Sequence, residues 1–436
     1  MFNNNLIKAI GVSVAVATLT TSPAHAAPDA ETSVVFNTLL FLFGGFLVMW
    51  MAAGFAMLEA GLVRTKNVAD ICLKNVSLFA VACIMWMLMG YNLMYEDVGA
   101  YFGTFFHLWS PDDTGVLETG YGSGSDFFFQ MVFVATTASI VSGTVAERVK
   151  LVPFLMFTVV LAGVIYPVQG SWEWGAGWLD QMGFSDFAGS TLVHSTGGWA
   201  ALVGAIIIGP RAGRYVDGRV RPIPGSSMPL ATLGVFILWL GWFGFNGASQ
   251  LALGTISDAV SVSNIFVNTN MAAAGGAIAA FITTKLLYKK IDLTMVLNGA
   301  LAGLVSITAE PLTPTPIAAT LIGAVGGVLV VFAVPFFDKL KIDDVVGAIS
   351  VHLVCGIWGT LAVPITNGDE GITFATQLIG IISIGMFVTV ASAITWYALK
   401  LTVGIRLSPE DEAQGADIAE LGMEAYPEFG KGSQKF

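Results

Sequence analysis

The chain alternates long apolar segments with short polar ones. A helix needs about 20 mainly apolar residues to cross a bilayer, and this criterion predicts eleven spans. They lie near residues 33–61, 69–95, 126–146, 151–169, 187–209, 228–249, 260–287, 291–309, 316–337, 344–366 and 372–400. The predicted fold is therefore an all-α membrane protein with eleven transmembrane helices.

The composition agrees with a membrane fold. Only 11% of the 436 residues are charged, whereas a soluble domain needs far more charge on its surface. The 50 glycines suit a bundle of membrane helices, because glycine lets helices approach closely. Three cysteines (Cys72, Cys83 and Cys355) are far apart in apolar segments and are interpreted as small buried hydrophobic residues.

The amino terminus has the pattern of a cleaved signal peptide. Lys8 precedes an apolar run over residues 10–17, and small residues follow at Ala24-His25-Ala26. We therefore expect residues 1–26 to be removed and the mature chain to begin at Ala27, outside the cytoplasm. A membrane domain over residues 27–407 and a polar tail over residues 408–436 follow.

The basic residues test this orientation independently. Lysine and arginine mark cytoplasmic loops. Those near the span ends all fall in the loops predicted to be inside: Arg64, Lys66, Arg148, Lys150, Arg211, Arg214, Arg219, Arg221, Lys285, Lys289, Lys290, Lys339, Lys341, Lys400 and Arg406. The predicted outer loops contain none, and the longest of them, residues 96–126, is acidic. The pattern predicts an inner (plasma) membrane protein with its amino terminus outside and its carboxyl terminus in the cytoplasm.

The fifth and tenth spans share a spaced motif that includes a histidine. Around both histidines an aspartate stands at minus eight, a glycine at minus five, a valine at minus one and a glycine at plus four. The two sets are Asp186, Gly189, Val193, His194 and Gly198, and Asp344, Gly347, Val351, His352 and Gly356. Because the two copies are five spans apart, they run in opposite directions. This predicts an inverted repeat of five plus five spans, with one additional helix and a conducting site between the halves.

His194 and His352 are the two histidines inside predicted spans. A membrane histidine can simply hydrogen-bond a neighbouring helix, and for either residue alone this structural role has the same weight as a functional one. The repeat favours function, because antiparallel copies bring both imidazoles to one axis. Two imidazoles in contact can share a proton and resist becoming charged together. No metal site is expected, since neither thiolate nor carboxylate lies at ligand spacing beside them.

Three tryptophans (Trp172, Trp174 and Trp178) precede the fifth span. They suit an aromatic belt at the membrane surface, but an indole face can also hold a small cation. The nearby acids Glu173, Asp180 and Asp186 favour a cation electrostatically. For Asp186 a structural role is preferred, as the cap that accepts backbone N–H bonds at the start of the fifth span.

Phenylalanines in the third and sixth spans suit a constriction. Phe245 and Ser249 are four residues apart and share a helix face, as do Phe129 and Phe133. Plain packing is the commoner role of a buried phenylalanine. A phenyl constriction is nevertheless what a pore needs to exclude water and hydrated ions.

Residues 186–211 resemble the signature of the ammonium transporter family over its full length. Shorter blocks at 61–67, 146–148, 241–246 and 351–356 are similar to other family blocks and occur in the family's order. The resemblance implies a homotrimer with one pore in each subunit and no cofactor. It implies that Trp174 and Ser249 recruit ammonium, that Phe133 and Phe245 form a stacked gate with Phe129 as the alternative to Phe133, and that His194 and His352 form the central pair.

The tail resembles the family's cytoplasmic tail at residues 415–417 and 425–426. This implies a trimeric signalling protein of the PII class as a partner. Leu421 and Met423 replace the histidine and glutamate that are usual there. The alternative, an acidic tail that is only solvated, has similar weight to a tail that binds this partner.

We therefore expect a transporter or channel that deprotonates ammonium at an outer aromatic site and conducts ammonia, with or without the proton. No enzyme activity and no nucleic-acid partner are expected. One alternative is a neutral ammonia or gas channel like the Rhesus proteins, against which Trp174 and Ser249 argue. Another is an ammonium sensor, which usually carries a cytoplasmic signalling domain larger than a tail of about thirty residues.

Overall fold

The computed structural model describes residues 29–428, so the predicted signal peptide and residues 429–436 lie outside the described part. Within the described residues, ten helical segments are long and apolar enough to cross a membrane, and α11 (Leu293–Ile307) is a shorter apolar helix where the eighth span is predicted. The predicted all-α membrane fold is confirmed. Six of these spans are single helices: α1 (Ala30–Leu62), α5 (Ser123–Val145), α9 (Met228–Ala248), α10 (Ile256–Tyr288), α12 (Pro316–Lys339) and α14 (Phe374–Thr402).

The other four long spans are composite. Each contains one π-helical turn, a wider turn that often occurs at functional sites. They are α2 (Val68–Met85), η2 (Trp86–Gly90) and α3 (Tyr91–Tyr95), entered through the 3₁₀ turn η1 (Thr65–Asn67); α6 (Leu151–Val160), η3 (Leu161–Ile165) and α7 (Tyr166–Ser171); η5 (Ser190–Ser195) and α8 (Thr196–Ile208); and η6 (Ile349–Val354) and α13 (Cys355–Thr366). The sequence pattern did not predict these turns.

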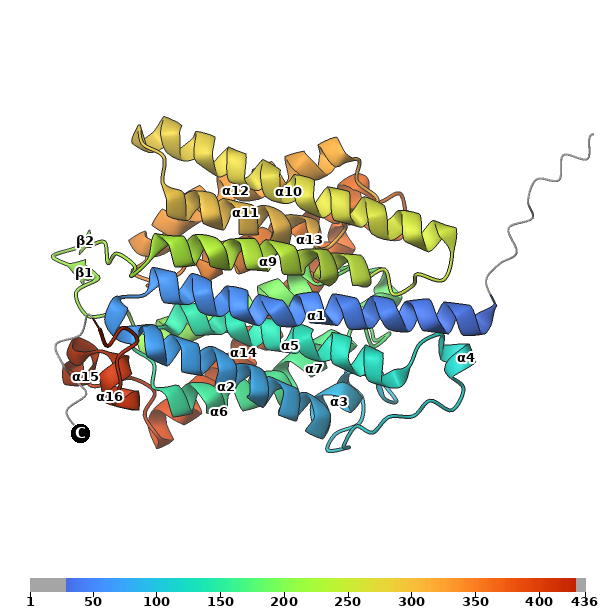
Figure 1. Cartoon of the computed structure of the whole chain (residues 1–436), viewed down its shortest axis with the longest axis horizontal. Helices are drawn as coiled ribbons and strands as arrows, with labels where there is room; N and C mark the ends of the chain where they lie inside the picture. Colours follow the sequence, from blue (N-terminus) through green and yellow to red (C-terminus); the bar gives the residue numbers. More distant parts are fainter. Residues whose placement is uncertain (1–28, 429–436) are drawn as a thin grey trace, which may run out of the picture.

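The spans lie side by side along the long axis of the molecule (Figure 1). Helix α1 packs along α9 and α5, while α10, α11 and α12 pack together. We call one end of the bundle the tail end, because α15 (Pro409–Gln414), α16 (Ala416–Leu421) and the hairpin β1 (Tyr215–Val216)–β2 (Arg219–Val220) lie there. The opposite, far end carries α4 (Val116–Thr119), and the short turn η4 (Asp180–Met182) follows α7.

Glycine sets the close approach of α1 and α9. A Cβ atom added at Gly61 would meet backbone atoms of Ser227 and Ala231, and one added at Gly234 would meet the backbone of Leu58. Larger side chains at these positions would force the two helices apart, which explains part of the high glycine content.

The described part of the tail is docked on the bundle. Lys66 Nζ donates to the carbonyl oxygens of Glu412 (2.8 Å) and Ala413 (2.5 Å), and the Asp417 carboxylate accepts from the backbone N–H of Asp70 (2.9 Å). Glu412 is 3% exposed and Asp417 is 1% exposed. The alternative of a fully solvated acidic tail is therefore wrong for residues 408–428.

Candidate functional site

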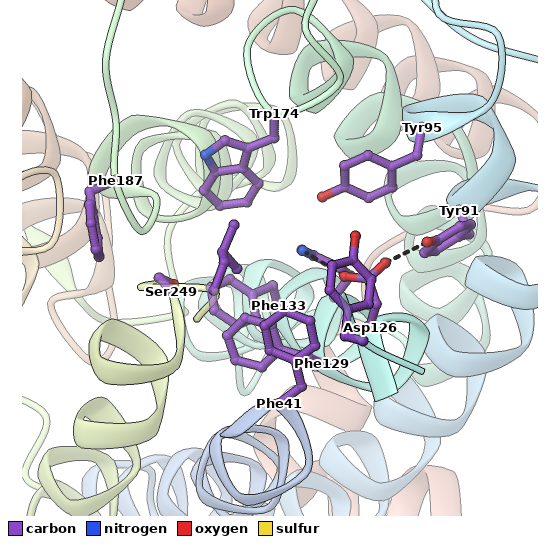
Figure 2. Close-up of a pocket in the computed structure, with 12 residues that line it drawn as sticks. Phe41, Tyr91, Tyr95, Asp126, Phe129, Phe133, Trp174, Phe187 and Ser249 are labelled. Carbon is purple, nitrogen blue, oxygen red and sulfur yellow. Dashed lines mark hydrogen bonds between the residues drawn. The ribbon is translucent and has the colours of Figure 1, made fainter. Parts of the chain in front are cut away.

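A cavity of about 420 Å³ lies at the far end of the bundle, between α1, α5, α9 and the loop after α7. Figure 2 shows its lining, which is mainly aromatic. Three predicted site residues line it: Trp174, Ser249 and Phe133. The structure thus brings together residues from three separate parts of the chain.

Trp174 is held in place by the loop that follows α7. Its backbone N–H donates to the carbonyl of Gly170 (3.0 Å), and its indole Nε1 donates to the carbonyl of Asp186 (3.0 Å). The ring meets Phe133 edge to face, with centroids 6.1 Å apart. The indole N–H is therefore engaged by the protein, while the ring itself lines the cavity.

Ser249 follows the last residue of α9. Its hydroxyl donates to the carbonyl of Phe245, at 2.7 Å. A hydroxyl has one proton and two acceptor lone pairs, so the oxygen of Ser249 remains able to accept a hydrogen bond from a ligand in the cavity.

Phe133 and Phe245 stack face to face below the cavity. Their centroids are 4.0 Å apart with an interplanar angle of 25°, and the side chains are 1% and 0% exposed. Phe129, the alternative to Phe133, instead stacks on Phe41 (5.4 Å, 2°) and meets Phe133 at an angle. Phe133 is therefore the α5 residue that faces Phe245.

His194 and His352 lie beneath the stacked rings. Their Nδ1 atoms are 3.1 Å apart, and their rings are inclined by only 22°. The His194 ring is 5.3 Å from that of Phe245, and His194 and His352 are 0% and 3% exposed. The Phe133–Phe245 stack thus lies between the cavity and the histidines.

The contact between the two Nδ1 atoms restricts the protonation of the pair. One Nδ1 must donate and the other accept, so the pair shares one proton across this contact. Two imidazolium ions at this distance would repel each other in a buried site. Toward the tail end, His352 lines a second cavity of about 10 Å³ with Glu59 and Asn298.

Both histidines lie on π-helical turns that begin after a glycine with positive φ, Gly189 (104°) and Gly347 (85°). The Asp186 carboxylate accepts four backbone N–H bonds at the first of these turns, at 2.7–3.0 Å, from Gly189, Ser190, Thr191 and Leu192. Asp344 accepts from Ala348 (3.0 Å) and Ile349 (2.8 Å) at the second. Matching aspartates thus orient the two histidine turns.

The acidic residues near Trp174 do not line the cavity. Burial raises the pKa of Glu173 well above its usual range, and its Oε1 accepts from the backbone N–H of Asp186 (2.7 Å). The carboxylate that does line the cavity belongs to Asp126, which sequence reasoning noted only as part of an acidic loop. Its spacing to Phe129 and Phe133 (three and seven residues) places it on the same helix face, and this signal was available in the sequence.

The comparisons with known proteins agree with this arrangement. The model of the Ammonium Transporter Family matches residues 39–426. Ammonium transporter Amt2 of Archaeoglobus fulgidus is 40% identical, with 96% of this chain and 95% of the relative covered. The ammonium transporter of Bacillus subtilis is 32% identical, with 89% and 98% covered.

Solved structures match over nearly the whole chain. A sensor Amt protein superposes with a TM-score of 0.84 at 35% identity, with 90% of this chain and 99% of that chain covered. Candida albicans Mep2 superposes with a TM-score of 0.78 at 26% identity, with 91% of each chain covered. The membership implied by residues 186–211 is confirmed: this multi-pass membrane protein belongs to the ammonium transporter family.

Proposed function

We propose that this protein transports ammonium, and that Trp174 and Ser249 recruit the ion at the far end of the bundle. An ammonium ion on the Trp174 ring would gain about 0.5–2 kcal/mol from cation–π attraction. It would also donate a hydrogen bond to the free lone pairs of Ser249. Both groups line the same cavity, which supports a shared ligand.

The Phe133–Phe245 stack separates the charged form from the neutral form of the substrate. Moving an ion through a dry apolar constriction is very costly, whereas neutral ammonia avoids most of this cost. We propose that ammonium loses its proton above the stack and that ammonia passes when the rings move aside.

The carrying observation is the His194–His352 contact directly beneath the stack. A histidine pair that shares one proton offers ammonia both a donor and an acceptor in an otherwise apolar channel. If the released proton follows through the imidazoles, transport is electrogenic. If it stays outside, transport is electrically neutral.

The larger organisation is also proposed. The matched histidine turns support an inverted repeat, and the basic residues gathered at the tail end support a cytoplasmic tail and an extracytoplasmic far end at the inner membrane. The family supports a homotrimer, and the docked tail offers a surface for a PII-type protein. A Rhesus-like neutral channel and an ammonium sensor are the alternative functions.

Rapid application of ammonium to proteoliposomes tests these alternatives. Electrogenic transport predicts a transient current above that of protein-free liposomes, with no response to sodium or potassium. No current, but a change in luminal pH, would indicate neutral conduction. No current and no pH change would contradict transport and favour sensing.

Replacement of both His194 and His352 by alanine tests the histidine pair. We expect the ammonium current to fall at least about tenfold, because a proton-transfer group typically contributes a factor of 10²–10⁴. His107→Ala is the matched control, since this exposed histidine pairs with Glu96 outside the cavity. An unchanged current and ion selectivity in a folded double variant would contradict a role in proton transfer.

A further inference from the structure

Asp126 places a carboxylate in the wall of the recruitment cavity. It lies in the first turn of α5 and is 8% exposed. It lines the same space as Trp174 and Ser249, and Figure 2 shows it across the cavity from Trp174.

The hydrogen bonds of Asp126 come from side chains. The Tyr91 hydroxyl donates to its Oδ2, and Gln130 Nε2 lies 3.4 Å from its Oδ1. Within residues 29–428, the carboxylate accepts no backbone N–H of α5, so capping of that helix does not account for it.

Within residues 29–428, no lysine, arginine or histidine forms an ion pair with this carboxylate. The described residues that line the cavity include neither lysine nor arginine. A buried charge is costly unless it is paired, and here the open side of the carboxylate faces a cavity. The missing partner is therefore expected to come from solution, as a small cation.

Two further tyrosines complete the surroundings of Asp126. The Tyr95 hydroxyl is buried, has no hydrogen-bond partner among residues 29–428, and points into the cavity between Trp174 and Asp126 (Figure 2). Burial, and secondly the charge of Asp126, raises the pKa of Tyr121, which also lines the cavity, to about 12. An ammonium ion has four N–H donors, and Asp126 and Tyr95 both line this space with oxygens that can accept them.

We propose that Asp126, Tyr91 and Tyr95 form a second cation subsite beside Trp174 and Ser249, for ammonium or methylammonium. Asp126 supplies the charge, Tyr91 orients the carboxylate, and Tyr95 accepts an N–H of the ion. The subsite selects the protonated form over neutral ammonia and loads the cavity ahead of the Phe133–Phe245 stack. This inference rests on the proposed function, because it assigns a loading step to the same cavity.

The test compares three variants with the unaltered protein through the ammonium dependence of the transient current in liposomes. Asp126→Asn removes the charge at nearly constant shape. We expect it to raise the half-saturating ammonium concentration at least about tenfold, the loss typical of a hydrogen bond to a charged group, with the maximal current within about twofold. Tyr95→Phe removes one acceptor and should raise the half-saturating ammonium concentration about threefold. Glu118→Gln removes an equal charge from the exposed helix α4 and should leave that concentration unchanged.

The outcomes separate this subsite from the proposed function. If the unaltered protein carries current and Asp126→Asn keeps its half-saturating concentration within twofold, the subsite is refuted. A shift of equal size in Glu118→Gln also refutes it, since surface charge alone then explains the effect. If Asp126→Asn does not fold, Tyr95→Phe decides, because its hydroxyl makes no hydrogen bond in the structure. If the unaltered protein carries no current, electrogenic transport fails, and calorimetric titration of ammonium into Asp126→Asn and unaltered protein still tests the subsite.

Discussion

At the scale of single residues, identical side chains have different roles because of what they face. Phe133 and Phe129 are four residues apart on α5, yet one stacks on Phe245 and the other on Phe41. Phe243 and Phe245 are two apart on α9, and Phe243 packs on Phe266 instead (5.2 Å). Residue type and spacing therefore narrow the choice of constriction residues, and contacts decide it.

Phe245→Ala tests whether the stack excludes ions. Loss of this buried ring should lower the free energy of unfolding by about 3–5 kcal/mol and leave a gap that water can enter. We expect the variant to carry a potassium current that the unaltered protein lacks. Phe243→Ala is the matched control and should not conduct potassium; continued exclusion of potassium by a folded Phe245→Ala protein would rule out the gate.

At the scale of elements, the π-helical turns place the histidines. Burial raises the pKa of Asp186, while four backbone hydrogen bonds favour its charged form. The same carboxylate therefore holds the start of η5 and fixes the direction in which His194 points. Asp344 does the same for η6, with an additional hydrogen bond from Thr144 Oγ1 (3.0 Å).

Asp186→Ala tests this support. It leaves four buried backbone N–H groups without their acceptor, so we expect the free energy of unfolding to fall by about 2 kcal/mol or more. Thermal unfolding in detergent measures the loss. Asp29→Ala removes the exposed cap of α1, which accepts one bond from Thr32 (2.7 Å), and should cost less than Asp186→Ala. Equal losses in the two variants would argue against a special role for Asp186.

At the scale of the whole molecule, buried charges join distant loops at the tail end. The Arg211 side chain donates two hydrogen bonds to Asp343, at 2.8 and 2.9 Å, and Glu147 pairs with Arg64 and Arg211. Burial alone would raise the pKa of Asp343, but hydrogen bonding to Arg211 and the charges of Arg148 and Arg211 hold it well below its usual range. Glu412 of the tail then pairs with Arg406 (2.8 Å).

Asp343→Asn should lower the free energy of unfolding by about 3–5 kcal/mol, because it leaves the buried Arg211 charge without its main partner. Since the pKa of Asp343 is lowered in the folded protein, its contribution is present above the unfolded value near 3.8 and is lost as pH falls through the folded pKa. Thermal unfolding at neutral pH measures the change.

The control for this network is Asp338→Asn. Asp338 pairs with Arg214 at a partly exposed site (2.9 Å), so its removal should cost about 1 kcal/mol or less. A loss below this level in Asp343→Asn would show that the buried pair does not hold the tail end together.

The sequence by itself determined the features that depend on which segments of the chain are apolar enough to lie in the bilayer. Apolar runs of membrane length predicted the spans, and the residues 186–211 identified the family. His194 and His352 were selected by residue type and spacing, and Trp174 and Ser249 by the resemblance to the family. Each of these signals lies within a short segment of sequence, because every transmembrane helix must by itself be long and apolar enough to cross the bilayer.

Only the tertiary structure decided which side chains meet. It paired Phe133 rather than Phe129 with Phe245, placed Asp126 rather than Glu173 in the cavity wall, introduced π-helical turns at both histidines, and docked the tail. Each of these depends on contacts between segments far apart in sequence. A single chain's periodicity sets which face of a helix a residue occupies, but the packing of all the spans sets what that face touches.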